Sequence, residues 1–230
     1  MATAKARQKE LPSTPVSAPD KKRANQIYTR LQRLYPDATC ALYHKNPFQL
    51  LVATILSAQC TDIRVNMVTP LLFKKFPSPK AMSCAKQSEL ETIIHSTGFY
   101  RNKAKSIIAA SQTIHENHGG KVPRSMEELL KLKGVARKTA NVVLGNAFDI
   151  NVGVVVDTHI GRLSRRLGFS QQTDPKKVEK DLMALFDSKK WTMLAHLLIY
   201  HGRQVCSARK PLCNDCSLAK WCPKIDVPQV

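Results

Sequence analysis

Four cysteines near the end of this 230-residue chain constrain its fold more than any other feature. They are Cys206, Cys213, Cys216 and Cys222, and they follow the spacing Cys-x6-Cys-x2-Cys-x5-Cys. Four thiols this close in sequence converge on one centre only if the chain wraps around it, which is a metal pattern and not a set of disulfides. Zinc sites usually have two close pairs of cysteines, whereas these uneven loops could also enclose a cubane iron–sulfur cluster. The spacing alone leaves zinc and a [4Fe-4S] cluster as alternatives.

Most of the chain carries helical signals. Apolar residues recur at spacings of three and four, and Asn46-Pro47, Ser78-Pro79 and Asp174-Pro175 each suit an N-cap followed by the first helical residue. The segment Ser125–Glu128 fits a capping box. We expect helices at 22–34, 47–59, 62–76, 88–95, 101–117, 125–131, 137–148, 157–167, 175–187 and 190–202. The β-branched run Val152–Val156 cannot build a sheet by itself, so we interpret it as an extended connector and the fold as all-α.

The chain is strongly basic. Lysine and arginine number 36 against 17 aspartate and glutamate residues, which gives a formal net charge of +19. Such an excess favours a polyanionic partner.

The N-terminal segment and the most apolar segment both bear on location. Residues 1–22 are basic, contain several prolines and hydroxyl side chains, and lack the apolar core of a secretory signal. We expect a disordered basic tail, although its composition also leaves organellar targeting open.

The most apolar stretch, Phe48–Ala58, is shorter than the roughly 20 residues of a membrane-spanning helix. We therefore predict a cytoplasmic protein with no membrane contact.

The segment Leu132–Ala140 is typical of a helix-hairpin-helix motif, with a glycine-bearing turn between two predicted helices. Such a turn leaves backbone N–H groups unpaired at the start of the second helix, and these bind phosphate oxygens with help from the helix dipole. Gly134, Val135, Ala136 and Arg137 are therefore candidate DNA contacts that carry no base identity. An ordinary turn between helices is the alternative.

Lys138 is the candidate nucleophile. The helix that follows has an apolar stripe, and at about 100° per residue Lys138 points roughly opposite to it. The stripe consists of Ala140, Val143, Leu144 and Ala147. A lysine attacks only as the neutral amine, which is a minor form because a free lysine side chain has a pKa of about 10.4. The helix N-terminus and Arg137 both disfavour the ammonium form, whereas a solvated surface lysine is the alternative.

Asp157 lies where the extended apolar run leads into the next predicted helix. It suits the N-cap of that helix. An ordered carboxylate that faces a cleft could also stabilise positive charge that develops in a substrate, and the two roles are compatible.

Together these residues resemble the endonuclease III family of DNA glycosylases, within the helix-hairpin-helix superfamily. The matching motifs occur in the family's order and cover about residues 23 to 224. They are Leu56–Asp62, Gly98–Ala104, the hairpin with Lys138, Val156–His159 and the four cysteines. The combination of a hairpin lysine, an aspartate and four cysteines is far more specific than any one motif.

The resemblance implies a bilobal all-α fold, the helix-hairpin-helix DNA glycosylase fold. A six-helix domain would span 41–152, and an iron–sulfur cluster lobe would combine an N-terminal helix at 23–40 with residues 153–230. DNA would bind across the cleft between the lobes. The four cysteines would hold a [4Fe-4S] cluster, which favours iron over zinc. Arg209 and Lys210, in the loop after Cys206, would contact the phosphate backbone.

The resemblance also implies a bifunctional DNA glycosylase and AP lyase of base excision repair. A monomer associated with the bacterial nucleoid would act on double-stranded DNA with oxidised pyrimidines or abasic sites. The target base would leave the stack, and Lys138 would form a Schiff base with the sugar before β-elimination cuts the strand. Asp157 would act as a base or an electrostatic stabiliser. Gln59 and Phe99 would fill the gap left by the flipped base, and His159 would contact the DNA.

Three positions depart from the family pattern. Lys133 stands where proline is usual, Ala136 where a second glycine is usual, and Phe99 where an aliphatic residue is often found. An alanine at positive φ would cost roughly 1 to 2 kcal/mol, so the turn either avoids that geometry or tolerates its cost.

Other activities stay open as alternatives. The adenine-removing branch of the superfamily has a catalytic glutamate where this chain has Thr54, and it lacks the hairpin lysine. A monofunctional mismatch glycosylase also lacks that lysine. A non-catalytic, metal-stapled DNA-binding protein would explain the charge, the hairpin and the cysteines, but it would leave Lys138 and Asp157 without a role.

Overall fold

The computed structural model describes residues 20–228, so the expected tail lies almost entirely outside the described residues. Within this range the chain forms α-helices and three short 3-10 helices, and it contains no β-strand, which confirms the all-α prediction. The α-helices are α1 (Lys21–Leu34), α2 (Pro47–Leu56), α3 (Asp62–Lys75), α4 (Pro79–Ser83), α5 (Gln87–Ile94), α6 (Tyr100–Asn117), α7 (Met126–Lys131), α8 (Arg137–Phe148), α9 (Thr158–Arg166), α10 (Pro175–Leu185) and α11 (Trp191–Gln204). The 3-10 helices are η1 (His95–Thr97), η2 (Ser188–Lys190) and η3 (Ala219–Trp221).

Short polar side chains set several helix starts. Asn46, Ser78 and Asp174 each accept a hydrogen bond from a backbone N–H in the first turn of the helix that follows, at 2.9, 3.2 and 2.8 Å. Each is followed by proline at the first helical position, where the missing N–H costs nothing. The three predicted caps are confirmed, although the helix after Ser78, α4, is absent from the expected set of helices.

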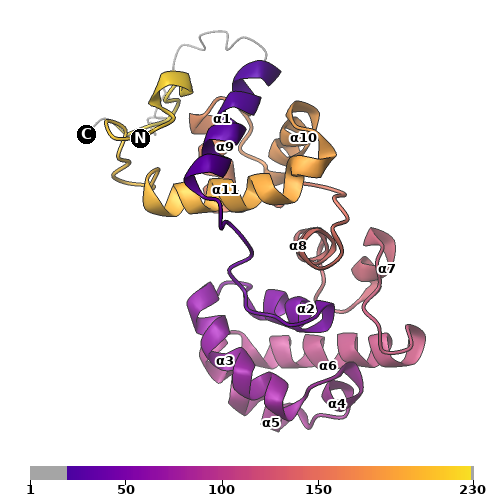
Figure 1. Cartoon of the computed structure of the whole chain (residues 1–230). Coiled ribbons are helices and arrows are strands. Elements are labelled where there is room, and N and C mark those ends of the chain that lie inside the picture. Colours follow the sequence, from indigo (N-terminus) through magenta and orange to yellow (C-terminus); the bar gives the residue numbers. More distant parts are fainter. Residues whose placement is uncertain (1–19, 229–230) are drawn as a thin grey trace, which may run out of the picture.

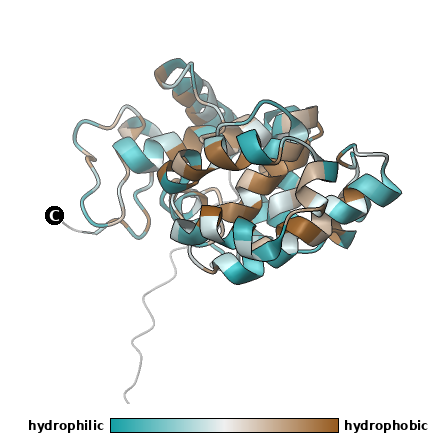
Figure 2. Ribbon diagram, turned by 90° about the horizontal axis from the view of Figure 1, so that it is seen from below, coloured by the Kyte–Doolittle hydropathy of each residue, from teal (hydrophilic) through white to brown (hydrophobic). Residues whose placement is uncertain are grey.

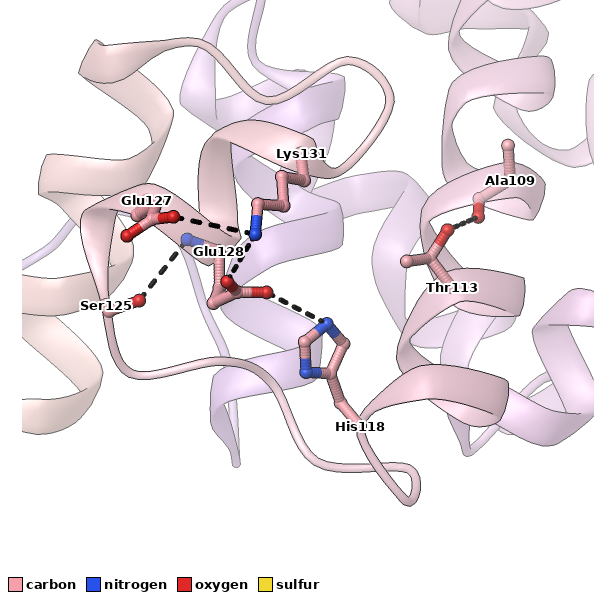
Figure 3. Close-up of polar contacts among 7 residues, drawn as sticks. All are labelled: Ala109, Thr113, His118, Ser125, Glu127, Glu128 and Lys131. Atoms are coloured by element: carbon pink, nitrogen blue, oxygen red, sulfur yellow. Dashed lines mark hydrogen bonds and ion pairs between the residues drawn. The ribbon is translucent and has the colours of Figure 1, made fainter.

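The capping box at Ser125 forms only in part (Figure 3). Ser125 Oγ accepts the N–H of Glu128 at 3.3 Å. The Glu128 carboxylate does not return to Ser125, because it accepts from Lys131 Nζ at 2.6 Å and lies 3.9 Å from His118 Nε2. An ion pair with a lysine one turn away thus replaces the second half of the box.

Buried apolar side chains form two clusters, and we name two lobes after them. The helical lobe comprises α2–α8, whose core runs from Leu42 to Leu144. The cysteine lobe comprises α1, α9–α11 and the chain from 205 to 228, whose core runs from Ala24 to Leu218. Figure 1 shows the helical lobe below and the cysteine lobe above, with α8 seen nearly end-on between them. In Figure 2 the brown, apolar stretches gather on the inner helices and the teal, hydrophilic ones lie outside.

Two segments cross between the lobes. One leads from α1 to α2, and the other leads from α8 through residues 149–157 to α9. The second segment contains the run Val152–Val156, which is a connector as expected but bends at residues 152 and 153, with Val154 buried in the cysteine-lobe core. The packing therefore places the end of α8 and the start of α9 next to the boundary between the lobes.

Candidate active site and cysteine cavity

A cleft of about 810 Å³ opens between the two lobes. Its walls come from the C-terminal end of α2, the loop that follows it, α8, α9 and α11. Four of the residues singled out from the sequence line it, namely Gln59, Lys138, Asp157 and His159. Phe99, Arg137, Arg209 and Lys210 are not among its lining residues.

Lys138 lies in the first turn of α8 with its side chain exposed toward the cleft. On the other side of the helix, Ala140, Val143 and Leu144 are fully buried in the helical-lobe core. The stripe predicted from the sequence therefore faces inward and leaves Lys138 on the open face.

The hairpin turn before α8 avoids the cost expected for an alanine. Ala136 is extended, with φ −98°, and only Gly134 takes a positive φ, of 81°. The turn closes through the Val135 N–H, which donates to the Leu132 carbonyl at 3.1 Å, and Val135 is buried. A Cβ on Gly134 would lie 2.6 Å from the Cβ of Ser106, so this position requires glycine for space as well as for φ.

Asp157 is the N-cap of α9. Its Oδ1 accepts the backbone N–H of Ile160 at 2.8 Å, and within residues 20–228 no side chain or backbone group donates to its Oδ2. The cap fixes the orientation of the carboxylate at the wall of the cleft. Capping and a role toward a substrate therefore coexist in this geometry.

His159 is half-buried at the same wall. Its Nδ1 lies 3.2 Å from Arg162 Nη2, a nitrogen that also donates to the carbonyls of Gly202 and Cys206, both at 3.1 Å. Burial lowers the pKa of His159, and the nearby Arg162 and Arg203 lower it further, while Asp157 acts in the opposite direction. The surroundings of the ring thus favour its neutral form at the edge of the cleft.

Arg137 is held by another side chain. Its Nε and Nη2 donate to the two carboxylate oxygens of Glu179 on α10, at 3.2 and 3.0 Å. Asn141 Nδ2 donates to Glu179 as well, at 3.1 Å. The guanidinium that the sequence places among the phosphate contacts is therefore engaged across the lobe boundary.

Gln59 and Phe99 share a rare backbone conformation. Both have left-handed φ, 53° and 47°, and both side chains are exposed. Gln59 lies at the cleft three residues after α2 ends at Leu56, and its left-handed backbone is incompatible with the predicted helix 47–59. Strained, non-glycine conformations of this kind concentrate at functional sites.

Sequence reasoning missed two contacts between polar side chains at the boundary between the lobes. Glu179 is 8% exposed and Asn141 5% exposed, and the ring of His196 donates to Asn146 Oδ1 at 2.7 Å. These pairs join residues 38 to 50 positions apart, and no local spacing connects them.

The four cysteines line one cavity within the cysteine lobe. Its other walls are mainly apolar and include Leu163, Leu167 and Pro211. Arg166 Nη1 donates to Cys206 Sγ at 3.3 Å, and its buried Nε has no partner within the described part of the chain. Four thiols facing one apolar cavity, with a buried cation beside them, fit an anionic cluster bound by thiolates. In residues 20–228, no three histidine, cysteine or acidic side chains stand where they could hold a single metal ion.

The loop between Cys206 and Cys213 carries Arg209 and Lys210, both exposed. Ser207 fixes the loop, because its Oγ donates to the Lys210 carbonyl at 2.7 Å and accepts the Lys210 N–H at 3.3 Å. Both basic side chains therefore project from an ordered turn.

An all-helical chain with a hairpin before a cleft lysine, a cleft aspartate from the other lobe and a four-cysteine loop has the architecture of a helix-hairpin-helix DNA glycosylase. The family model for HhH-GPD superfamily base excision DNA repair proteins matches residues 52–188. Endonuclease III of Synechocystis sp. is 57% identical over 206 residues, covering 90% of this chain and 94% of the relative. Endonuclease III of Bacillus subtilis is 47% identical, covering 82% and 86%. The chain belongs to the endonuclease III family.

Solved structures agree with this assignment. A trapped endonuclease III–DNA covalent intermediate is 42% identical, with a TM-score of 0.83 over 89% of this chain and 96% of that one. A thermostable thymine-DNA glycosylase is 21% identical and shares the fold, with a TM-score of 0.78, covering 88% and 96%. The protein is therefore a DNA N-glycosylase and AP lyase of base excision repair. No helix in residues 20–228 has the length and hydropathy to cross a membrane.

Proposed function

We propose that this enzyme excises oxidised pyrimidines and cleaves abasic sites in double-stranded DNA through a Schiff base on Lys138. The observation that supports the proposal is that Lys138 and Asp157, carried by different lobes, line the same cleft. A cleft of about 810 Å³ also has room for an everted nucleotide. The nucleotide must leave the duplex because the sugar C1′ atom and its bond to the base are unreachable inside the stack.

The bonds change in two stages. Neutral Lys138 Nζ attacks the sugar C1′, the bond between C1′ and the base breaks, and the base leaves with its electron pair and gains a proton. Nζ loses one proton, and the C1′–O4′ bond then breaks with O4′ gaining a proton, which leaves a protonated Schiff base between Nζ and C1′. This iminium acidifies the C2′ hydrogens, so loss of one of them expels the 3′ phosphate and cuts the strand. Water then releases Lys138.

Asp157 supports the first stage. Its cap to α9 holds the carboxylate still at the wall of the cleft, which allows it to accept the proton from Lys138 or to stabilise positive charge at C1′. Both roles require a negatively charged carboxylate at the wall of the cleft, and neither requires a conformational change of the protein.

The DNA contacts in our proposal come from both lobes. The backbone N–H groups of Gly134 and Ala136 bind a phosphate, while the Val135 N–H closes the turn on the Leu132 carbonyl. Arg209 and Lys210 bind the DNA backbone from the cysteine loop. His159 contacts the DNA at the edge of the cleft. The exposed side chains of Gln59 and Phe99 fill the gap left by the everted base.

We also propose that Cys206, Cys213, Cys216 and Cys222 hold a [4Fe-4S] cluster. When bound, such a cluster cross-links the loop after α11 and supplies no step of the hydrolytic or lyase chemistry. Arg166, which donates to Cys206 Sγ, compensates the negative charge of the ligands. The two apolar cores support a division of the chain into domains at about residues 41 and 153. We also propose that the enzyme acts as a monomer in the cytoplasm.

The proposal is tested by trapping with borohydride. Wild-type protein incubated with duplexes carrying thymine glycol or an abasic site gives a covalent adduct, and Lys138→Gln gives none. Lys105→Gln, which removes another exposed lysine outside the cleft, is the matched control and keeps the adduct. Full adduct yield in Lys138→Gln would refute the assignment of Lys138. Equal rates on oxidised and undamaged pyrimidines would refute the proposed substrate.

A further inference from the structure

A buried carboxylate joins the two lobes beside the cleft. Glu179 lies on α10 of the cysteine lobe and is 8% exposed. All three of its hydrogen bonds come from α8 of the helical lobe, two from Arg137 and one from Asn141. Arg137 directly precedes Lys138, and Asn141 follows Lys138 by about one helical turn. Glu179 thus holds the helix on both sides of the proposed nucleophile.

The connector between the lobes packs directly onto this group. A Cβ on Gly153 would lie 2.1 Å from Glu179 Oε1 and 2.8 Å from Asn141 Nδ2. Only glycine lets the chain pass here while the carboxylate keeps its place. The close approach of the connector at Gly153 therefore depends on the Glu179 carboxylate staying in this position.

Asn141 depends on Glu179 for its orientation. Its Nδ2 donates to Glu179, and its buried Oδ1 has no partner within residues 20–228. Because the carboxylate accepts hydrogen bonds only, the amide cannot turn over without losing its single contact. Asn141 also lines the cleft.

The other end of α8 is attached separately. Asn146 accepts from the ring of His196 on α11 at 2.7 Å, and its amide orientation is set because its Nδ2 donates to the Val142 carbonyl at 2.8 Å. Attachment at both ends fixes the rotation of α8 about its own axis as well as its position. Loss of the N-terminal attachment would free only the turn that carries Lys138.

We propose that Glu179 is a positioning residue for the lyase reaction, which sets the place of Lys138 relative to Asp157 by anchoring the first turn of α8 to the cysteine lobe. The inference rests on the proposed role of Lys138. Lys138 and Asp157 come from different lobes, so their separation depends on how α8 sits against the cysteine lobe. Small misplacements of reacting groups cost large factors in rate.

Two substitutions test the proposal by different routes. Glu179→Gln removes the charge and one acceptor, whereas Gly153→Ala keeps every charge and pushes on the carboxylate with a new methyl group. The single-turnover rate of strand cleavage at a preformed abasic site should fall by about tenfold or more in both variants. Affinity for a duplex with a non-cleavable tetrahydrofuran site should change by less than about threefold, because the DNA-contacting surface is unchanged.

The control is Glu89→Gln, which removes the carboxylate paired with Lys75 inside the helical lobe and should leave the rate unchanged. Rates are expressed per folded protein, determined by circular dichroism. If neither main variant yields folded protein, Arg137→Lys carries the test, because it keeps the charge and alters neither α10 nor the connector. It should lower the rate in the same way, since lysine cannot make both contacts.

Three outcomes would overturn the positioning role. The first is that both variants cleave within about twofold of the wild-type rate, and the second is that they lose only affinity for DNA. The third is that Glu179→Gln cleaves slowly while Gly153→Ala cleaves at the normal rate, which would show that only the charge of Glu179 matters. Lys138→Gln is trapped with borohydride in parallel. An adduct in that variant would refute the role of Lys138 itself, independently of what Glu179 does.

Discussion

Arg137 on α8 donates hydrogen bonds from Nε and Nη2 to both carboxylate oxygens of Glu179 on α10, a residue 42 positions later. The pair cancels one positive charge at the start of the helix that carries Lys138. Of the basic residues predicted to contact phosphate, Arg209 and Lys210 are exposed without such a pairing to an acidic side chain in residues 20–228. The distribution of usable charge therefore differs from the distribution of basic residues in the sequence.

The salt dependence of DNA binding should reflect this difference. Replacing Arg209 by alanine removes one phosphate contact, so the slope of log K against log salt concentration should fall by about 0.9. The double variant Arg137→Gln with Glu179→Gln removes a neutral unit and should leave the slope nearly unchanged. Titration of a labelled duplex at several salt concentrations measures both slopes. A drop of about 0.9 in the double variant would mean that Arg137 leaves Glu179 to bind phosphate.

Asp157 offers a separation of capping from catalysis. Asparagine is as good an N-cap as aspartate, so Asp157→Asn should keep thermal stability while the cleavage rate falls by about a hundredfold. Asp157→Ala should lose the rate and also about 0.5 to 2 kcal/mol of unfolding free energy. Single-turnover kinetics and urea unfolding of both variants provide the comparison. If Asp157→Asn were fully active, capping α9 would be the residue's only role.

Gly134 should be intolerant of alanine for two reasons. Its φ of 81° is unfavourable for an L-residue, and the new Cβ would meet Ser106 at 2.6 Å. We expect Gly134→Ala to lose about 2 kcal/mol or more of stability and to bind DNA more weakly. Adding Ser106→Gly removes the clash but not the backbone cost, so a double-mutant cycle should show favourable coupling. Gly161→Ala, on α9 with open space at the Cβ position, is the control and should stabilise the protein.

Gln59 should show a trade between stability and activity. Its left-handed φ of 53° costs roughly 1 to 2 kcal/mol, which a glycine would relieve at the expense of a more flexible unfolded chain. Gln59→Gly should therefore be as stable as wild type or slightly more stable, while excision of a damaged base falls about tenfold because the gap is unfilled. Asparagine adopts the same left-handed conformation with a shorter side chain. Gln59→Asn therefore tests the effect of side-chain length on excision separately from the effect of the backbone conformation. Unimpaired excision by Gln59→Gly would contradict a gap-filling role.

His196 should make the protein sensitive to mild acid. Burial lowers its pKa from 6.5 to about 4, so between these values the unfolded state binds a proton that the folded state excludes. Above pH 6.5 this residue does not lower the free energy of unfolding. As the pH falls to about 4, it lowers that free energy by an amount that grows to about 3 kcal/mol. His196→Gln keeps a donor for Asn146 and does not titrate, so its unfolding free energy should fall less over this range. Parallel stability curves for the two proteins would exclude His196 as the source.

Local features of the fold were readable from the sequence because they depend on contacts within a few residues. The caps at Asn46, Ser78 and Asp174 are hydrogen bonds that span two or three positions. The apolar stripe of α8 follows from helical periodicity alone. The same local reasoning missed α4, which has only five residues. It also extended α2, which ends at Leu56, as far as Gln59, whose left-handed backbone cannot belong to a helix.

The sequence by itself determined the all-helical class, the glycine turn before Lys138, the cap at Asp157 and the four cysteines of one loop. Tertiary structure alone decided that Lys138 and Asp157 share a cleft, that Glu179 holds Arg137, and that Gly153 packs against that carboxylate. The physical reason is the range of the interactions. Helix caps and turns gain their energy from neighbours in the chain, whereas the partner of a buried charge is set by which helices the two apolar cores bring together.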